Sequence, residues 1–97
     1  NMDEYQSAKA EGAQIFRQAI KYIKTHGLQH NSMDILLAVT PGKRWPQPMA
    51  VLMFSELENQ LLGATLTTFD RQTTNPQDVI DLFERVAVSL SNDILKT

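Results

Sequence analysis

The sequence of 97 residues contains no cysteine. This absence excludes a disulfide, a thiolate nucleophile, an iron–sulfur cluster and a zinc site built from cysteines. Small secreted domains often depend on disulfides for stability, so a chain without cysteine is also more typical of the reducing cytoplasm. We therefore expect a cytoplasmic protein.

A surplus of basic residues is lacking as well. Nine lysines and arginines stand against eleven aspartates and glutamates, and the formal net charge is −2. Nucleic-acid-binding proteins normally carry a basic surplus that neutralises phosphates, so nucleic acid is not an expected partner. No apolar run approaches the roughly 20 residues that span a bilayer, and no basic cluster precedes an apolar stretch near residue 1. We expect neither a membrane span nor a signal peptide.

The motifs of common catalytic sites are also missing. The sequence has no GxSxG, GxxxxGK[ST], GxGxxG or HExxH pattern. General acid–base chemistry needs carboxyl groups in a cleft, and nothing in the pattern places one there. The carboxylates that occur in clusters are expected at a turn or on the wet side of a helix: Glu56, Glu58, Asp78, Asp81 and Glu84. We predict no catalytic residue, no cofactor and no enzymatic activity.

One histidine pair has a spacing that could bind metal. His26 and His30 are four residues apart, which places two ligands on one face only if the helix is continuous. Gly27 lies between them and is expected to end the helix. A third ligand, such as Asp34, would have to be assumed. We predict no metal site.

What is present is the composition of an ordinary globular domain. Apolar residues make up 42% and charged residues 21% of the chain. At this length one domain is the natural count, and about 60–65% of the unfolded surface can be buried. We expect a single domain over residues 1–97.

Two segments have the apolar stripe of an amphipathic helix. The first covers Asp3–His26 and is expected to end at Gly27, which adopts the left-handed conformation without a steric penalty. The second is expected to begin at Pro76, a residue favoured at the first helical position, after a cap at Asn75. Its apolar side chains recur at helical spacing as far as Ile94.

The middle of the chain favours strands. Met33–Thr40 alternates its side chains between two partly apolar faces, as a buried strand does. Met49–Ser55 and Gln60–Phe69 fit a β-hairpin with a turn near residues 56–59. The alternative is a helix over Met49–Leu62, opened by Pro48. We favour the hairpin because the apolar run after Pro48 is short, unbroken and without a helical stripe.

The predicted fold class is therefore α+β: an N-terminal helix, a three-stranded antiparallel meander and a C-terminal helix. The alternative order is helix–strand–helix–strand–helix. A sheet with two apolar faces would expose apolar surface unless a second copy of the chain covered it, because large exposed apolar patches usually mark interfaces. We expect a homodimer.

The stretch TPGKRWPQP, residues Thr40–Pro48, holds three of the four prolines and the only tryptophan. Prolines reduce the entropy lost when a loop is fixed. Tryptophan and arginine are favoured as binding anchors, so Lys43, Arg44 and Trp45 are the candidate partner-binding residues. The sequence favours the alternative that Trp45 folds back and closes one end of the core.

These observations predict a small non-catalytic protein-interaction module that self-associates through an apolar sheet face. One alternative is an inhibitor or immunity-type protein that masks a partner enzyme with a concentrated charged surface. Another is a small-molecule binder or small enzyme with Trp45 at the mouth of a pocket.

Overall fold

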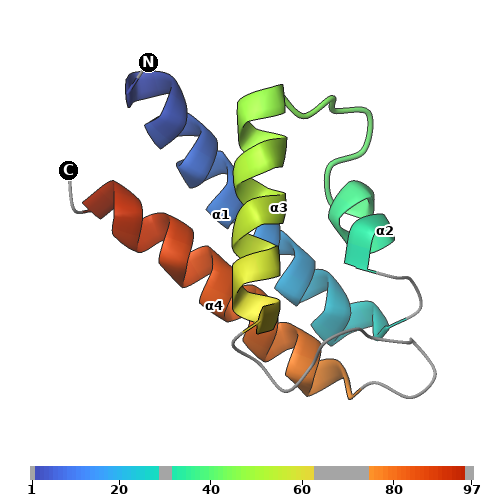
Figure 1. The fold of residues 1–97 in the computed structure, drawn as a ribbon. Coiled ribbons are helices and arrows are strands. Elements are labelled where there is room, and N and C mark those ends of the chain that lie inside the picture. The colour runs from blue at the N-terminus through green and yellow to red at the C-terminus, as the bar shows by residue number, and fades with distance from the viewer. Residues whose placement is uncertain (1, 29–31, 63–74, 96–97) are drawn as a thin grey trace.

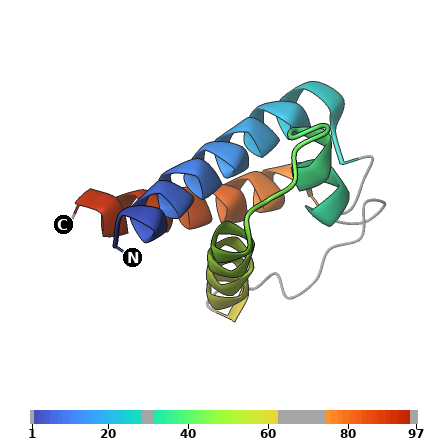
Figure 2. The ribbon, with the colours of Figure 1, turned by 90° about the horizontal axis from the view of Figure 1, so that it is seen from above.

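A computed structural model of the chain describes residues 2–28, 32–62 and 75–95, and these residues form four helices and no strand (Figure 1). The helices in chain order are α1 (Met2–His26), α2 (Ser32–Ala38), α3 (Gln47–Leu62) and α4 (Pro76–Leu95). α1 and α4 lie antiparallel, side by side, and α3 crosses both on one face of this pair (Figures 1 and 2). α2 packs against α1.

The prediction of an α+β fold with a three-stranded meander is wrong. Met33–Thr40, predicted as a strand, lies mostly in α2. Met49–Ser55, predicted as the second strand, lies in α3, and so do the first three residues of the predicted strand Gln60–Phe69, whose remainder lies outside the described residues. The order helix–strand–helix–strand–helix is wrong at its first strand. The helix that it placed over Met49–Leu62 is confirmed.

The physical reason is that a short apolar run does not distinguish a strand from a buried helix. Among the α2 side chains that the structure describes, the neighbours Ile35 and Leu36 are completely buried, and Val39 packs against the core one turn later. This is one face of a helix, whereas alternation would have buried every second residue. The Val39 amide nitrogen lies 3.2 Å from the Ile35 carbonyl oxygen, as in a helical turn.

α1 ends at His26 and α4 begins at Pro76, as the sequence predicts. Gly27 ends α1 with a φ of 75°, and its amide nitrogen lies 2.8 Å from the Ile23 carbonyl oxygen. Asn75 caps α4: its side-chain oxygen accepts a hydrogen bond from the Gln77 amide at 2.9 Å. Local signals of this kind fix a helix end without help from the rest of the fold.

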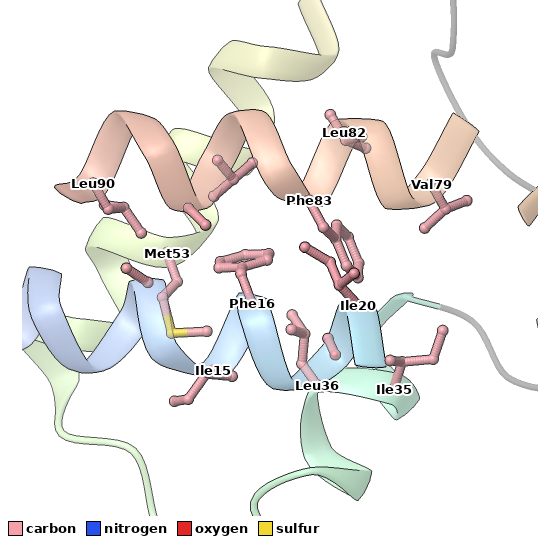
Figure 3. Close-up of a cluster of buried hydrophobic side chains, with 14 of the residues drawn as sticks. Ile15, Phe16, Ile20, Ile35, Leu36, Met53, Val79, Leu82, Phe83 and Leu90 are labelled. Atoms are coloured by element: carbon pink, nitrogen blue, oxygen red, sulfur yellow. The ribbon is translucent and has the colours of Figure 1, made fainter. Parts of the chain in front are cut away.

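The core lies where α1, α3 and α4 meet. Phe16 of α1 and Phe83 of α4 point toward one another with ring centroids 5.2 Å apart, edge to face (Figure 3). Met53 of α3 reaches the same cluster above Gly12, and a Cβ added to Gly12 would lie only 3.0 Å from Met53 Cγ. The glycine thus lets α3 approach α1 closely. The largest completely buried side chains are Phe16, Phe83, Ile23, Ile35, Leu36, Met49, Met53, Leu82, Val79 and Val86.

Candidate interaction surface

α3 carries apolar side chains around its whole circumference. Met49 and Met53 are completely buried against the rest of the protein, whereas Val51 is 54% and Phe54 39% exposed. A helix that is apolar on all sides is normally buried on all sides. Among the described residues, however, α3 packs against α1 and α4, which lie on one side of it (Figure 2). Its outer side therefore presents apolar surface to solvent.

Four of the exposed residues of α3 form a regular stripe, and Pro48, Ser55 and Asn59 are exposed beside it. Gln47, Val51, Phe54 and Glu58 are all exposed and are spaced by four, three and four residues. At the helical period their side chains lie within an arc of about 60°. We call these four residues the α3 seam. Leu61, three residues further on, extends the same spacing but is half-buried against the core.

Trp45 joins this surface to the core. Its ring is half-buried and packs against the core cluster, and its centroid lies 6.2 Å from that of Phe54. The indole Nε1 donates a hydrogen bond to Thr40 Oγ1 at 3.1 Å, and that hydroxyl donates to the Leu36 carbonyl oxygen at 3.0 Å. The ring is therefore held in place by α2 on one edge while it extends the apolar surface beyond Phe54.

The two cations beside Trp45 have different surroundings. Lys43 forms an ion pair with Glu11 of α1. Both side chains are well exposed, at 47% and 39%, so the pair adds little stability although it links the loop to α1. Arg44 is exposed. The structure thus keeps Lys43, Arg44 and Trp45 in one loop and places the ring of Trp45 beside that of Phe54.

Of three hollows on the described surface, one is lined by seam residues, Gln47 and Val51. It has a volume of about 400 Å³ and lies between the first turns of α1 and α3, where Tyr5 and Pro48 also line it. A second of about 500 Å³ adjoins it and shares Glu4 and Pro48 with it. A third, of about 600 Å³, is lined mainly by polar side chains of α4. Trp45 is not among the residues that line these three hollows.

The groups considered for chemistry lie apart from one another. His26 is exposed; its ring stacks on Tyr22 with centroids 4.3 Å apart, and His30 lies outside the described residues. Asp81 accepts a hydrogen bond from Gln77 Nε2 at 2.9 Å. Among the described residues, no three histidine or acidic side chains are close enough to hold a metal ion, and no polar side chain is buried. The seam offers a ligand apolar contact and, at its ends, one amide and one carboxylate.

The sequence analysis missed the α3 seam because it assigned Met49–Ser55 to a strand. In a strand Val51 and Phe54 would point to opposite faces, since side chains alternate. The signal that could have found the seam is the spacing of four, three and four residues that begins at Gln47, which fits only a helix.

Within residues 2–28, 32–62 and 75–95, no helix is both long enough and apolar enough to cross a bilayer. Comparisons of the chain with protein-family models, with curated proteins and with solved structures gave no match.

Proposed function

We propose that this chain is a small non-catalytic protein-interaction module that binds its partner through the α3 seam. The observation that carries the proposal is the exposure of the neighbouring apolar side chains Val51 and Phe54 on the outer side of α3. Exposed apolar surface costs solubility, and in soluble proteins a contiguous patch of it usually marks a binding site. The cost is explained if a partner covers this side of α3.

Trp45 supports the same proposal. Binding energy at interfaces concentrates in a few large side chains, with tryptophan among the most frequent. Trp45 lies beside Phe54 and is held by its hydrogen bond to Thr40, so little side-chain entropy is lost when a partner packs on it. Arg44, exposed in the same loop, can contribute at the rim, and Lys43 can do so if it leaves Glu11.

The character of the seam favours this function over masking of an enzyme. An inhibitor or immunity-type protein was expected to present a concentrated charged surface. The seam contains one acidic side chain, Glu58, beside two apolar side chains and one amide. The cytoplasmic location and the exclusion of nucleic acid and membrane as partners remain predictions from composition.

Site-specific photo-crosslinking tests the proposal. A photoreactive phenylalanine derivative is placed at position 54 and, in a control protein, at position 14, where Gln14 is exposed on α1. After irradiation in cells we expect one discrete adduct from position 54 and none from position 14. No adduct at position 54, or equal labelling from both positions, would overturn the proposal.

A further inference from the structure

We infer that the α3 seam binds a second copy of this chain, with the two α3 helices paired antiparallel. This inference rests on the proposed function and names its partner. Four observations carry it: the spacing of the seam, the match between its two polar ends, the way α3 projects from the protein, and the size of the surface.

The spacing of the seam is that of a coiled-coil contact line. Apolar contacts between paired helices recur at alternating steps of three and four residues, the a and d positions of a heptad. Gln47, Val51, Phe54 and Glu58 follow the steps four, three and four, so they occupy d, a, d and a. A surface helix that packs only on its own core normally carries polar residues on its outer side, without apolar residues at this spacing.

The antiparallel arrangement pairs the seam with itself. If Val51 packs against the partner's Phe54, then the two-fold axis passes between Leu52 and Met53. The same axis places Gln47 beside the partner's Glu58, because residues 47 and 58, like residues 51 and 54, are equally far from the midpoint between Leu52 and Met53. The amide of Gln47 can then donate a hydrogen bond to the partner's Glu58 carboxylate, at both ends of the contact.

A parallel arrangement lacks this match. It would place Glu58 next to the partner's Glu58, and like charges held together at an interface are unfavourable. It would also leave each Gln47 beside the partner's Gln47, away from any carboxylate of the seam. The polar ends of the seam therefore select the antiparallel pair.

The shape of the protein leaves room for the second copy. α3 projects from the layer formed by α1 and α4 (Figure 2), and the seam residues are exposed, although Gln47 and Val51 border a hollow shared with Glu4 and Tyr5 of α1. α3 has 16 residues and is about 24 Å long. A contact along one helix of this length buries less than the roughly 800 Å² per partner of a standard interface, so the dimer is weak and reversible.

Charge variants that restore one another test the pairing. Val51→Lys and Phe54→Glu each place a charge opposite an apolar side chain, and each alone should weaken dimerisation by about tenfold or more, as loss of a central contact does. In an equimolar mixture Lys at position 51 meets Glu at position 54 of the other variant, while the second Val51–Phe54 contact stays native. Sedimentation velocity should then show heterodimers at a concentration at which each variant alone is monomeric.

The controls separate the possible outcomes. Gln14→Lys should dimerise like the unmodified chain, and circular dichroism should show that all variants stay helical, since the substituted sites are exposed. Because the chain has no cysteine, Val51→Cys mixed with Phe54→Cys gives a second readout, a disulfide between the two variants.

Two results would overturn the inference. An unmodified chain that is monomeric at every concentration would exclude the second copy. A mixture of charge variants that stays monomeric, without the mixed disulfide, would exclude the antiparallel register. If either result is found but position 54 still crosslinks to a different protein, the proposed function stands and only the inference of a second copy fails. If position 54 gives no crosslinked adduct at all, the proposed function and this inference both fail.

Discussion

Replacement of Gly12 by alanine probes the crossing of α1 and α3, on which the position of the α3 seam depends. A Cβ at Gly12 would lie 3.0 Å from Met53 Cγ and 3.5 Å from Leu90 Cδ1. The first distance is shorter than a normal carbon–carbon contact, so Met53 would have to shift, whereas the second is acceptable.

Two energies then oppose one another. Alanine is preferred over glycine inside a helix by about 1 kcal/mol. Overpacking a well-packed core costs about 1–3 kcal/mol. Met53 is completely buried and therefore cannot move freely, so we expect Gly12→Ala to lower the free energy of unfolding by about 0–2 kcal/mol.

Truncation of Met53 separates these two energies. Met53→Ala removes the Cγ and Sδ atoms that the new Cβ would meet and should itself cost about 2–5 kcal/mol. In that background Gly12→Ala should raise the free energy of unfolding by about 0.5–1 kcal/mol, because only the helix preference remains. The assay is urea unfolding of all four proteins, followed by circular dichroism and analysed as a double-mutant cycle.

The matched control lies on the exposed side of the same helix. Ala10→Gly should cost about 1 kcal/mol with or without Met53, because Ala10 is exposed and only helix preference is changed. If Gly12→Ala stabilises the protein by about 1 kcal/mol in both backgrounds, α3 does not cross α1 at Gly12 and the reasoning is refuted.

Substitutions at Trp45, Thr40, Asn75 and Lys43 test local features of the fold. Trp45→Ala should lower the free energy of unfolding by about 2–3 kcal/mol, because the ring is half-buried and makes one hydrogen bond, whereas Trp45→Phe should lower it by about 1 kcal/mol. Thr40→Val and Trp45→Phe remove the same hydrogen bond, so their effects on urea unfolding should not add. Asn75→Ala should cost about 1 kcal/mol through loss of the α4 cap, and Asn75→Asp should restore it. Lys43→Ala should cost less than about 1 kcal/mol, and the difference should shrink in high salt, because the ion pair to α1 is exposed. A loss above 3 kcal/mol on Lys43→Ala, or none on Trp45→Ala, would contradict the contacts described for this loop.

The sequence predicts α1 and α4 well because their signals are local and agree with one another. Each has a continuous apolar stripe on one side and polar residues on the other, and each has a residue suited to its end, Gly27 after α1 and Asn75 before α4. Periodicity and capping then point to the same boundaries.

α2 and α3 are harder to predict because their outer sides are not polar. Leu37 on α2, and Val51 and Phe54 on α3, are exposed apolar side chains that interrupt the contrast on which a helical stripe depends. An apolar run without that contrast resembles a buried strand. Val51 and Phe54, which hid α3 from prediction, also belong to its seam, and a departure from the usual pattern is what the proposed binding role would require.

The loop shows a second kind of limit. Composition singled out Lys43, Arg44 and Trp45, but it could not show that Thr40 accepts the indole hydrogen bond or that Glu11, far away in the sequence, pairs with Lys43. These contacts depend on how α1, α2 and the loop come together in space. The partner-binding role of the three residues stays a prediction.

The central claim, that the outer side of α3 binds a partner and that the partner is a second copy, is tested most directly by amide chemical shifts of the labelled chain during dilution. Between about 1 mM and about 20 µM, a range suited to a weak interface, we predict progressive shifts at Val51, Phe54 and Glu58, with Gln14 on α1 unchanged. Spectra that do not depend on concentration, or shifts confined to the exposed side of α1, would contradict the account.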